Sequence, residues 1–533
     1  SVVVEGEHIT FVGPEVDARR CAPPDAEIVN LQGGMLLPGF VDGHDHFATL
    51  AVTKLGVDMS GINGKDAILA KIRDFVRAHP GEHVYRGFGW YPGSFAESSP
   101  RREWLDEITG DIPMVVNSAD SHDLWFNTAA MRLAGISAST PDPEPNQYYV
   151  RDSDGVPTGH ALEGAALIPI LAAVGTFTVD CFRQAQALTL DQAPSYGITS
   201  YFEAGAFMGE TSADSEPIYA DFIERDLAGA LDVRIAGSYW TRSPTDDPQQ
   251  IAVALTDWHA RLRSPHVSIA HCKMWSDGVL FSGGSLLLQP TCGPSPSVGR
   301  MTFEGDQIAA IVCAVQEAGF DMHIHVDGDG SVRTVLDAIE AVQRQIGRGD
   351  SRHLICHNTL VDPDDLPRFA AMGVLANGTP LWGTDYHGQY RQIYTDLLGV
   401  DRVEERLFPY GDLVRSGAIV TYGADLPGVD VPEVPPLIQI EALLTRKRPG
   451  FADDAPLVAR QRIGLHDALR GYTVNGAYQL RMEDRIGSIT VGKRADLVML
   501  GANLFQVSPQ EVHQVPVQLT LMDGRVTFAG RGG

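Results

Sequence analysis

Two histidines one residue apart, His44 and His46, end the apolar stretch "LLPGFVDGHDHF" at residues 36–47. In an extended strand, side chains at positions i and i+2 lie on the same face, so both imidazoles would project into one space. Such a pair can chelate a divalent metal. Solvated histidines at a strand end are the alternative, because a chain with 17 histidines has a fair chance of one such spacing. The choice depends on what the rest of the chain places beside them.

Further candidate ligands fall where other strands are predicted to end. These are Lys273 near the end of a fourth strand, His325 at the end of a fifth, His357 at the end of a sixth and Asp425 at the end of an eighth. Scattered surface residues would fall on helices and loops as readily, so this common position favours a metal site. Neutral imidazoles bind divalent metals such as Zn²⁺, and a carboxylate such as Asp425 can bind metal while exchanging a proton with bound water.

Lys273 is the unusual member of this set. As an ammonium it would repel metal ions, so beside two cations it makes sense only as a neutral amine or as a carbamate formed with CO₂, which would bridge the metals with two oxygens. The alternative is a salt bridge between Lys273 and Asp277. Both interpretations remain open on the residues alone.

Alternating strand-like and helical segments predict the elements that position these residues. From residue 197 onward, short apolar runs alternate with amphipathic stretches such as 306–319 and 331–347. Strand, helix, strand repeats imply a parallel sheet with right-handed crossovers, and residues 36–47 bring the number of strands to eight. Eight parallel strands predict an α/β fold, a (β/α)₈ TIM-like barrel with its chemistry at the carboxyl ends of the strands.

The remaining sequence divides around this barrel, which we place at residues 36–483. Residues 1–35 and 484–533 contain short alternating strands broken by turns, and they predict a small β-sandwich domain built from both chain termini. Residues 48–190 are too long for an ordinary connection and predict a subdomain inserted over the barrel mouth. In it, Trp90 and Trp125 either bind substrate or form that subdomain's own core.

Composition excludes several classes of partner. Lys and Arg number 41 against 68 Asp and Glu, so a net charge of −27 disfavours nucleic acid and anionic membrane surfaces. The six cysteines are scattered without a C-x-x-C pair, which fits a reducing, cytoplasmic location. Neither a signal peptide nor an apolar stretch long enough to span a membrane is visible. We expect a cytoplasmic protein with a small-molecule substrate, and a homo-oligomer remains open.

With these motifs the sequence resembles the metal-dependent amidohydrolases, in particular the amidohydrolase 3 branch that includes N-substituted formamide deformylases. The resemblance covers nearly the whole chain and is carried by "PGFVDGHDHF", "CKMWSDG", "HIHVDGDGSVRTVLDA", "LICHN", "GADLP", "YTVNGAY" and "GSITVGKRADLVML". It implies a binuclear zinc centre in which His44, His46 and Asp425 hold one ion, His325 and His357 hold the other, and carbamylated Lys273 bridges them. His323 lies on the same face as His325, but His325 matches the family pattern.

Two residues of the inserted region also match the branch. "DSHDLWFNTAAM" resembles a segment near the substrate, so His122 is a candidate for binding substrate and polarising its carbonyl oxygen, with a structural histidine as the alternative. Glu163 matches a family glutamate whose role is not assigned. The chain departs from the branch at "HVDGDGS", "DGVLFSGGS" and Cys356, around the pocket rather than at the metals, so substrate identity does not transfer from one relative.

The resemblance implies a hydrolase that cleaves the C–N bond of a carboxamide or N-formyl amide with an apolar substituent. A metal-activated hydroxide would attack the carbonyl, a metal or His122 would stabilise the oxyanion, and Asp425 would carry the proton to the leaving amine. Alternatives on the same site are ester or lactone hydrolysis and a non-hydrolytic decarboxylation. A metal-binding module without turnover is a different class, against which the presence of Asp425 argues.

Overall fold

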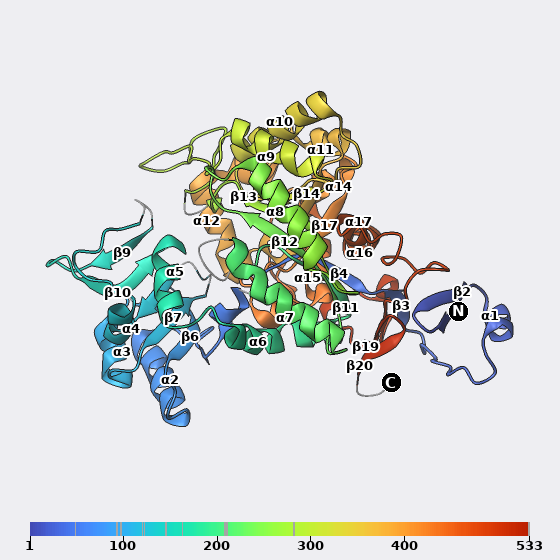
Figure 1. The fold of residues 1–533 in the computed structure, drawn as a ribbon, viewed down its shortest axis with the longest axis horizontal. Coiled ribbons are helices and arrows are strands. Elements are labelled where there is room, and N and C mark those ends of the chain that lie inside the picture. Colours follow the sequence, from blue (N-terminus) through green and yellow to red (C-terminus); the bar gives the residue numbers. More distant parts are fainter. Residues whose placement is uncertain are drawn as a thin grey trace.

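A computed structural model describes residues 1–47, 50–91, 94–95, 99–119, 121, 123–143, 147–162, 164–206, 212–280 and 283–530. It contains a barrel, an inserted subdomain and sheets formed by the two ends of the chain (Figure 1). Within those ranges, no helix combines the length and the apolar character needed to cross a bilayer.

The barrel is an eight-stranded sheet in the order β17-β16-β15-β14-β13-β12-β11-β4. Its strands are β4 (Phe40–Asp45), β11 (Ile198–Glu203), β12 (Arg234–Thr241), β13 (Val267–Trp275), β14 (Asp321–Val326), β15 (Leu354–His357), β16 (Leu375–Gly378) and β17 (Val420–Tyr422). Neighbouring strands pair in parallel, with Lys273 opposite His323 and Val326 opposite His357. All of β14 is buried, because one face points into the barrel and helices cover the other. The predicted eight-stranded barrel is confirmed.

Helices follow the strands and pack around the outside of the barrel (Figure 1). They are α6 (Val179–Leu188), α7 (Glu216–Leu227), α8 (Pro248–Arg261), α9 (Gly305–Glu317), α10 (Asp329–Ile346), α11 (Leu366–Met372), α12 (Tyr390–Leu398), α13 (Val400–Arg406), α14 (Tyr410–Arg415), α15 (Pro436–Thr445), α16 (Leu465–Gly471) and α17 (Val474–Gln479). In α10, Val332, Val335, Leu336 and Ile339 are fully buried, and their spacing of three and four residues forms the apolar face that contacts the sheet.

Hydrogen bonds join the first strand to the segment that follows the last one. The carboxylate of Asp42 accepts hydrogen bonds from the backbone N–H groups of His44 at 3.1 Å and Ala424 at 3.0 Å. The backbone N–H of Asp425 donates to the carbonyl oxygen of His44 at 3.0 Å. These bonds bring the two edges of the sheet together and hold Asp425 against His44.

The region between β4 and β11 forms a six-stranded sheet with helices (Figure 1). Its elements are the 3₁₀ turn η1 (Leu50–Lys54), β5 (Val57–Asp58), α2 (Lys65–Ala78), β6 (Tyr85–Trp90), α3 (Arg102–Thr109), β7 (Met114–Ser118), β8 (Asp123–Phe126), α4 (Thr128–Leu133), β9 (Tyr148–Arg151), β10 (Pro157–Leu162) and α5 (Gly164–Ala173). We call these elements the insertion. It lies on one side of the barrel, opposite the sheets of the chain ends.

The two ends of the chain meet in antiparallel sheets. The elements are β1 (Val2–Glu5), β2 (His8–Val12), α1 (Glu15–Cys21), β3 (Met35–Pro38), β18 (Leu497–Leu500), β19 (Val517–Met522) and β20 (Arg525–Ala529). β18 pairs with β3, and β1 pairs with β2. β3 continues almost directly into β4, so the C-terminal sheet positions the strand that carries His44.

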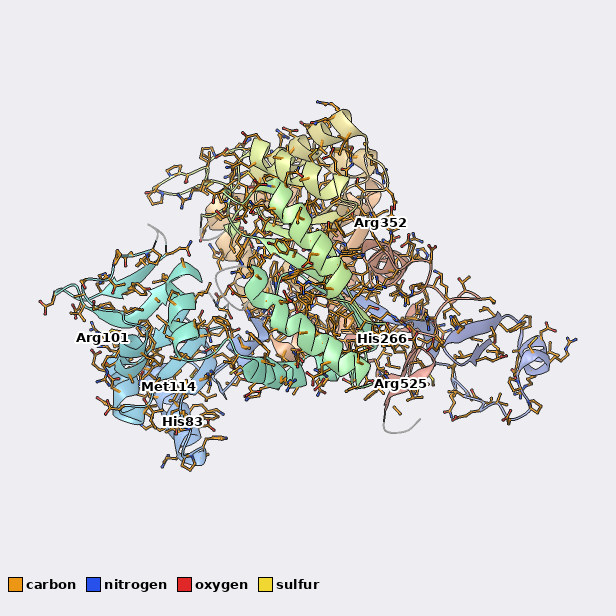
Figure 2. All side chains as sticks on the ribbon, in the orientation of Figure 1. His83, Arg101, Met114, His266, Arg352 and Arg525 are labelled. Carbon is orange, nitrogen blue, oxygen red and sulfur yellow. The ribbon has the colours of Figure 1, made fainter. Side chains whose placement is uncertain are left out.

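Buried charges connect this terminal sheet to the barrel. Arg234 of β12 donates to Asp496 at 2.7 Å and also pairs with Asp523. His266, labelled in Figure 2, lies at the same junction, with Nε2 2.7 Å from Asp523 and Nδ1 2.5 Å from Asp226. Because both ring nitrogens face carboxylates, hydrogen bonds with Asp523 and Asp226 raise the pKa of His266.

Candidate metal centre

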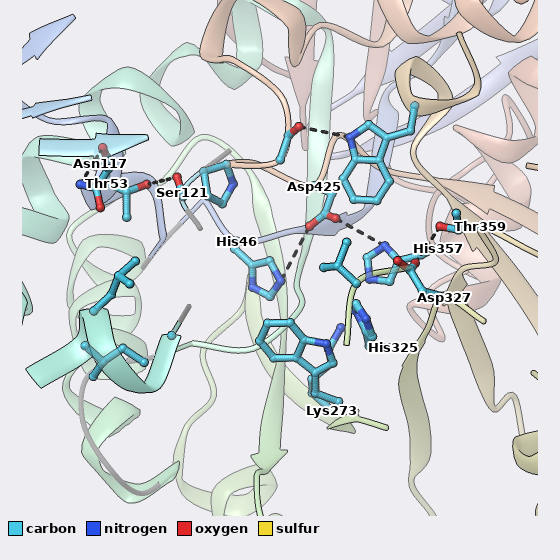
Figure 3. A pocket seen from close by; sticks show the side chains of 18 of the residues that line it. His46, Thr53, Asn117, Ser121, Lys273, His325, Asp327, His357, Thr359 and Asp425 are labelled. Atoms are coloured by element: carbon cyan, nitrogen blue, oxygen red, sulfur yellow. Dashed lines mark hydrogen bonds and ion pairs between the residues drawn. The ribbon is translucent and has the colours of Figure 1, made fainter. Parts of the chain in front are cut away.

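Three histidine rings converge on Asp425. Its Oδ1 atom lies 3.4 Å from Nε2 of His44. Figure 3 shows the other two contacts: Oδ1 lies 3.8 Å from Nε2 of His46, and Oδ2 lies 3.4 Å from Nδ1 of His357. Ligand atoms of His44, His46 and Asp425 all lie within 4.8 Å of one another. That spacing is close enough for the three side chains to share one divalent ion after small movements.

His44 is fixed by a second buried histidine. Its Nδ1 atom lies 2.7 Å from Nε2 of His323, and both side chains are fully buried. The His323 ring stacks on Phe202, with centroids 4.4 Å apart. His323 therefore lies beneath His44, and its Nε2 atom can accept a hydrogen bond from Nδ1–H of His44 when the Nε2 atom of His44 faces a cation.

His325 and His357 lie together on the other side of Asp425. Their ring centroids are 4.4 Å apart, and Nε2 of His325 lies 3.6 Å from Oδ1 of Asp277. Asp277 in turn accepts hydrogen bonds from the backbone N–H groups of Asp327 and Gly328. A carboxylate fixed in this way can orient a metal-binding imidazole.

Lys273 reaches the same space from β13. Its Nζ atom donates to the Cys356 sulfur at 3.5 Å, and its side chain is buried. Among the described residues, no carboxylate forms an ion pair with Lys273, and Asp277 instead faces His325. The salt bridge between Lys273 and Asp277, the alternative considered above, is therefore absent from this part of the chain.

Burial lowers the pKa of all four histidines at this rim. The pKa of His46 falls to about 4 and that of His357 to about 3, while those of His44 and His325 lie well below the usual range. Burial is the largest cause in each case, and the positive charge of Lys273 acts in the same direction. These rings are neutral at pH 7, the form whose lone pairs bind metal.

The hydrogen-bonding state of the rim fits a bound cation. Nε2 of His44 and Nδ1 of His357 are buried and have no hydrogen-bond partner among the described residues, although both face Asp425. Buried nitrogens without partners are costly in a folded protein. Divalent ions beside the two nitrogens would satisfy their lone pairs and would neutralise the carboxylate between them.

A cavity of about 260 Å³ adjoins the rim. Its apolar walls come from the barrel and from the insertion, and they include Trp240, Trp275, Trp382, Tyr390, Tyr394, Leu167, Ile168, Leu171 and Phe177. The indole of Trp382 stacks on His357, with centroids 5.6 Å apart and planes inclined by 24°. The space beside the candidate metal ligands therefore suits an apolar group.

Trp90 and Trp125 are not among the described residues that line this cavity. Both are fully buried in the insertion's own apolar core, where Nε1 of Trp90 donates to the carbonyl of Val116 and Nε1 of Trp125 donates to that of Arg101. This packing corrects the expectation that they bind substrate, because a ring enclosed in the core of the insertion has no face left for a ligand. His122 and Glu163 lie outside the described residues.

The cavity is also lined by residues outside the predicted set of site residues. Trp240 and Trp275 lie at the carboxyl ends of β12 and β13. Because the chemistry of a barrel lies at the carboxyl ends of its strands, this position could have identified both as pocket residues. Leu167 and Leu171 come from α5 of the insertion, and no motif marks them. Their contribution depends on how the insertion folds against the barrel.

Known proteins resemble this chain over nearly its whole length. The N-substituted formamide deformylase of Arthrobacter pascens is 26% identical over 553 residues, which covers 100% of this chain and 95% of that protein. The protein LONG AFTER FAR-RED 3 of Arabidopsis thaliana is 25% identical over 507 residues, covering 94% of this chain and 83% of that protein. An uncharacterized metal-dependent hydrolase from Pyrococcus horikoshii has the same fold, with a TM-score of 0.74, 22% identity, and coverage of 95% of this chain and 94% of that one.

The sequence model described as "Amidohydrolase family" matches residues 27–528, which is nearly the whole chain. This match spans the barrel, the insertion and nearly all of the four-stranded terminal sheet, and it begins after β1 and β2. It confirms the family suggested by the sequence motifs, and with it the expectation of a hydrolase. The chain therefore belongs to the amidohydrolase family.

Proposed function

We propose that this protein hydrolyses the C–N bond of a carboxamide or N-formyl amide that carries an apolar substituent. The observation that carries this proposal is the convergence of the rings of His44, His46 and His357 on the carboxylate of Asp425. Two divalent ions such as Zn²⁺, held by His44, His46 and Asp425 and by His325 and His357, would supply Lewis acidity and a water of lowered pKa. The relative named as an N-substituted formamide deformylase supports the C–N substrate class.

In the proposed reaction, Asp425 moves the proton that hydrolysis requires. Attack by water forms a C–O bond and releases a proton, which the carboxylate accepts, and breaking the C–N bond requires a proton on the departing nitrogen, which the same group returns. The products are a carboxylate, which is formate for an N-formyl substrate, and a free amine. The neighbouring histidines are neutral and cannot replace Asp425 as the acid.

The surroundings of Lys273 support its carbamylation. A buried ammonium without an anionic partner is costly, whereas a neutral amine can react with CO₂ to give a carbamate and a released proton. The resulting anion would lie among the neutral rings of His44, His46 and His325 and could bridge the two ions. The Cys356 thiol, the partner seen for Nζ, would then lie beside the carbamate.

Metal analysis and a substrate panel test the proposal together. We expect between one and two divalent ions per chain, and turnover of N-formyl and other carboxamides exceeding that of matched esters and carboxylic acids. His44→Ala combined with His46→Ala should lose activity and at least one ion. The matched control is the double variant His79→Ala with His83→Ala, which changes two exposed histidines after α2. This variant should retain both its activity and its bound metal.

The same panel separates the other reactions. Preferred turnover of esters or lactones would replace the C–N assignment while keeping the metal centre, and release of CO₂ from a carboxylic acid would indicate decarboxylation. Metal binding without turnover of any compound class would indicate a binding module. Unchanged metal content in the double variant of His44 and His46 would remove the metal assignment itself.

A further inference from the structure

The cavity has a polar wall that the proposed reaction does not use. Thr53, Asn117 and Ser121 line it and come from the insertion. Figure 3 shows these three side chains gathered on one side, with His46 between them and His357. The substrate would therefore meet the metal ligands at one end and this polar wall at the other.

Asn117 presents an unsatisfied acceptor within this wall. Its side chain is only 4% exposed, and its Nδ2 atom donates to the backbone carbonyl of Thr53 at 3.4 Å. The reverse orientation of the amide would place two oxygens against each other, so Oδ1 is the atom that remains available. Oδ1 is buried and has no hydrogen-bond partner among the described residues. A buried acceptor at a cavity wall needs a partner, and a ligand in the cavity can provide one.

A buried lysine holds this wall in place. Nζ of Lys54 donates to the carbonyl of Ala119 at 3.0 Å and pairs with Asp430 at 3.0 Å. Lys54 is the neighbour of Thr53, and Ala119 lies two residues after Asn117, while Asp430 belongs to the loop that follows Asp425. The polar wall and the loop of the proposed acid–base residue are thus fixed to one another, as a preorganised binding site requires.

The charge of the wall defines the group that it can accept. Its three side chains are neutral, and the ammonium of Lys54 is engaged by Ala119 and Asp430. Among the described lining residues other than histidines, the only basic side chain is Lys273, at the metal rim. The described part of the wall therefore lacks a cation that would bind a carboxylate, and a neutral hydrogen-bond donor fits it best.

We propose that Oδ1 of Asn117 accepts a hydrogen bond from a neutral hydroxyl or amide N–H group at the far end of the substrate's apolar substituent. This inference deepens the proposed function and rests on it for its catalytic consequence. The reacting carbonyl lies at the rim, the apolar part contacts the tryptophans and the α5 leucines, and the donor reaches Asn117. A substituent without a donor fills the cavity and leaves Oδ1 unpaired, so donor-bearing amides are favoured by about 10- to 100-fold.

Matched substrates test this preference without any mutation. The probes are formanilides with a hydroxyl or a methyl group at the 3 or 4 position of the ring. For the better of the two positions, kcat/KM of the hydroxyl compound should exceed that of its methyl partner by about tenfold or more. Dissociation constants of the same pairs, from tryptophan fluorescence of the metal-free protein, should differ in the same direction because Trp240, Trp275 and Trp382 line the cavity.

Variants assign the preference to one atom. In Asn117→Leu, kcat/KM of the hydroxyl compound should lie within about threefold of that of its methyl partner. Asn117→Ala provides a second test should the leucine side chain impair folding. Thr53→Val is the control, because it changes the same wall but retains the backbone carbonyl that orients Asn117, and it should keep the preference. Unfolding midpoints and metal content establish that each variant is intact.

The outcomes distinguish the two proposals. Hydrolysis of both members of every pair at similar kcat/KM overturns the role of Asn117 and leaves amide hydrolysis standing. Selective binding of the hydroxyl compounds that is lost in Asn117→Leu, without hydrolysis of any amide, overturns the proposed function and supports the polar wall. A preference that survives in both Asn117 variants assigns it to another group and overturns the inference.

Discussion

Replacing His323 with Phe should weaken metal binding far more than folding. His44 can offer Nε2 to a cation only when its proton lies on Nδ1, and the acceptor for that proton is Nε2 of His323, 2.7 Å away. Without the acceptor, the metal-bound state contains a buried N–H without a partner. The cost of such a group is about 1–3 kcal/mol, so the dissociation constant should rise by about 10- to 100-fold.

The metal-free protein can avoid most of this penalty. Its His44 can carry the proton on Nε2, which faces Asp425 at 3.4 Å. The substitution also removes Nδ1 of His323, a buried atom with no hydrogen-bond partner among the described residues. A Phe ring can keep the stacking contact with Phe202. We therefore expect the free energy of unfolding of metal-free His323→Phe to stay close to that of the wild type.

The assay is competition for Zn²⁺ between the metal-free protein and a chelator of known affinity, with unfolding midpoints measured in parallel. His271→Phe is the matched control, because His271 is also buried inside the barrel but bonds to the carbonyl of Gln479 rather than to a proposed ligand. The Zn²⁺ dissociation constant of His271→Phe should stay within about threefold of that of the wild type. Equal affinity of wild type and His323→Phe, or an equal loss in His271→Phe, would refute the reasoning.

Three further predictions concern the acid–base residue, the bridge and the domain junction. Asp425→Asn should lower kcat by about 10²- to 10⁴-fold with a smaller change in KM, and steady-state kinetics showing a wild-type kcat would reduce Asp425 to a structural role. Lys273→Ala should be nearly inactive and partly restored by acetate or propionate, so full activity without either acid would reject the carbamate. The hydrogen bonds that raise the pKa of His266 stabilise the fold in full below about pH 6.5, the pKa of a histidine in the unfolded chain. This stabilisation is lost as the pH rises through the pKa of His266 in the folded protein. The free energies of unfolding in urea of His266→Gln and wild type should therefore converge as the pH rises from 6 to 9. A difference between them that does not change with pH would contradict the pairing of His266 with Asp226 and Asp523.

The barrel and the positions of the rim residues could be predicted because both follow local rules. Alternating apolar and amphipathic segments identify the strands, and parallel strands in a barrel place their carboxyl ends at one rim. This placed His44, His325 and Asp425 near one another without knowledge of any contact. The prediction needed only the order of the elements, since the geometry of the barrel supplies the rest.

The contacts that tune the site could not be predicted in the same way. His44 and His323 are 279 residues apart, and nothing in either segment indicates that their ring nitrogens meet. Trp90 and Trp125 were ambiguous because an aromatic residue in a strand suits a pocket and a core equally well. In the folded insertion, Trp90 and Trp125 pack in the core, whereas Asn117, which no motif marks, lines the cavity.

The strand that carries His44 depends on parts of the chain that are synthesised after all of the proposed ligands. The backbone N–H of Val41 donates to the carbonyl of Tyr472, Nε2 of Gln479 donates to the carbonyl of Gly43 at 2.6 Å, and β3 pairs with β18. A nascent chain released at about residue 470 would contain every proposed ligand and yet lack the supports of their first strand. We therefore expect metal loading to follow synthesis of β18, and ribosome-bound chains that stop before β18 to remain metal-free even when zinc is plentiful.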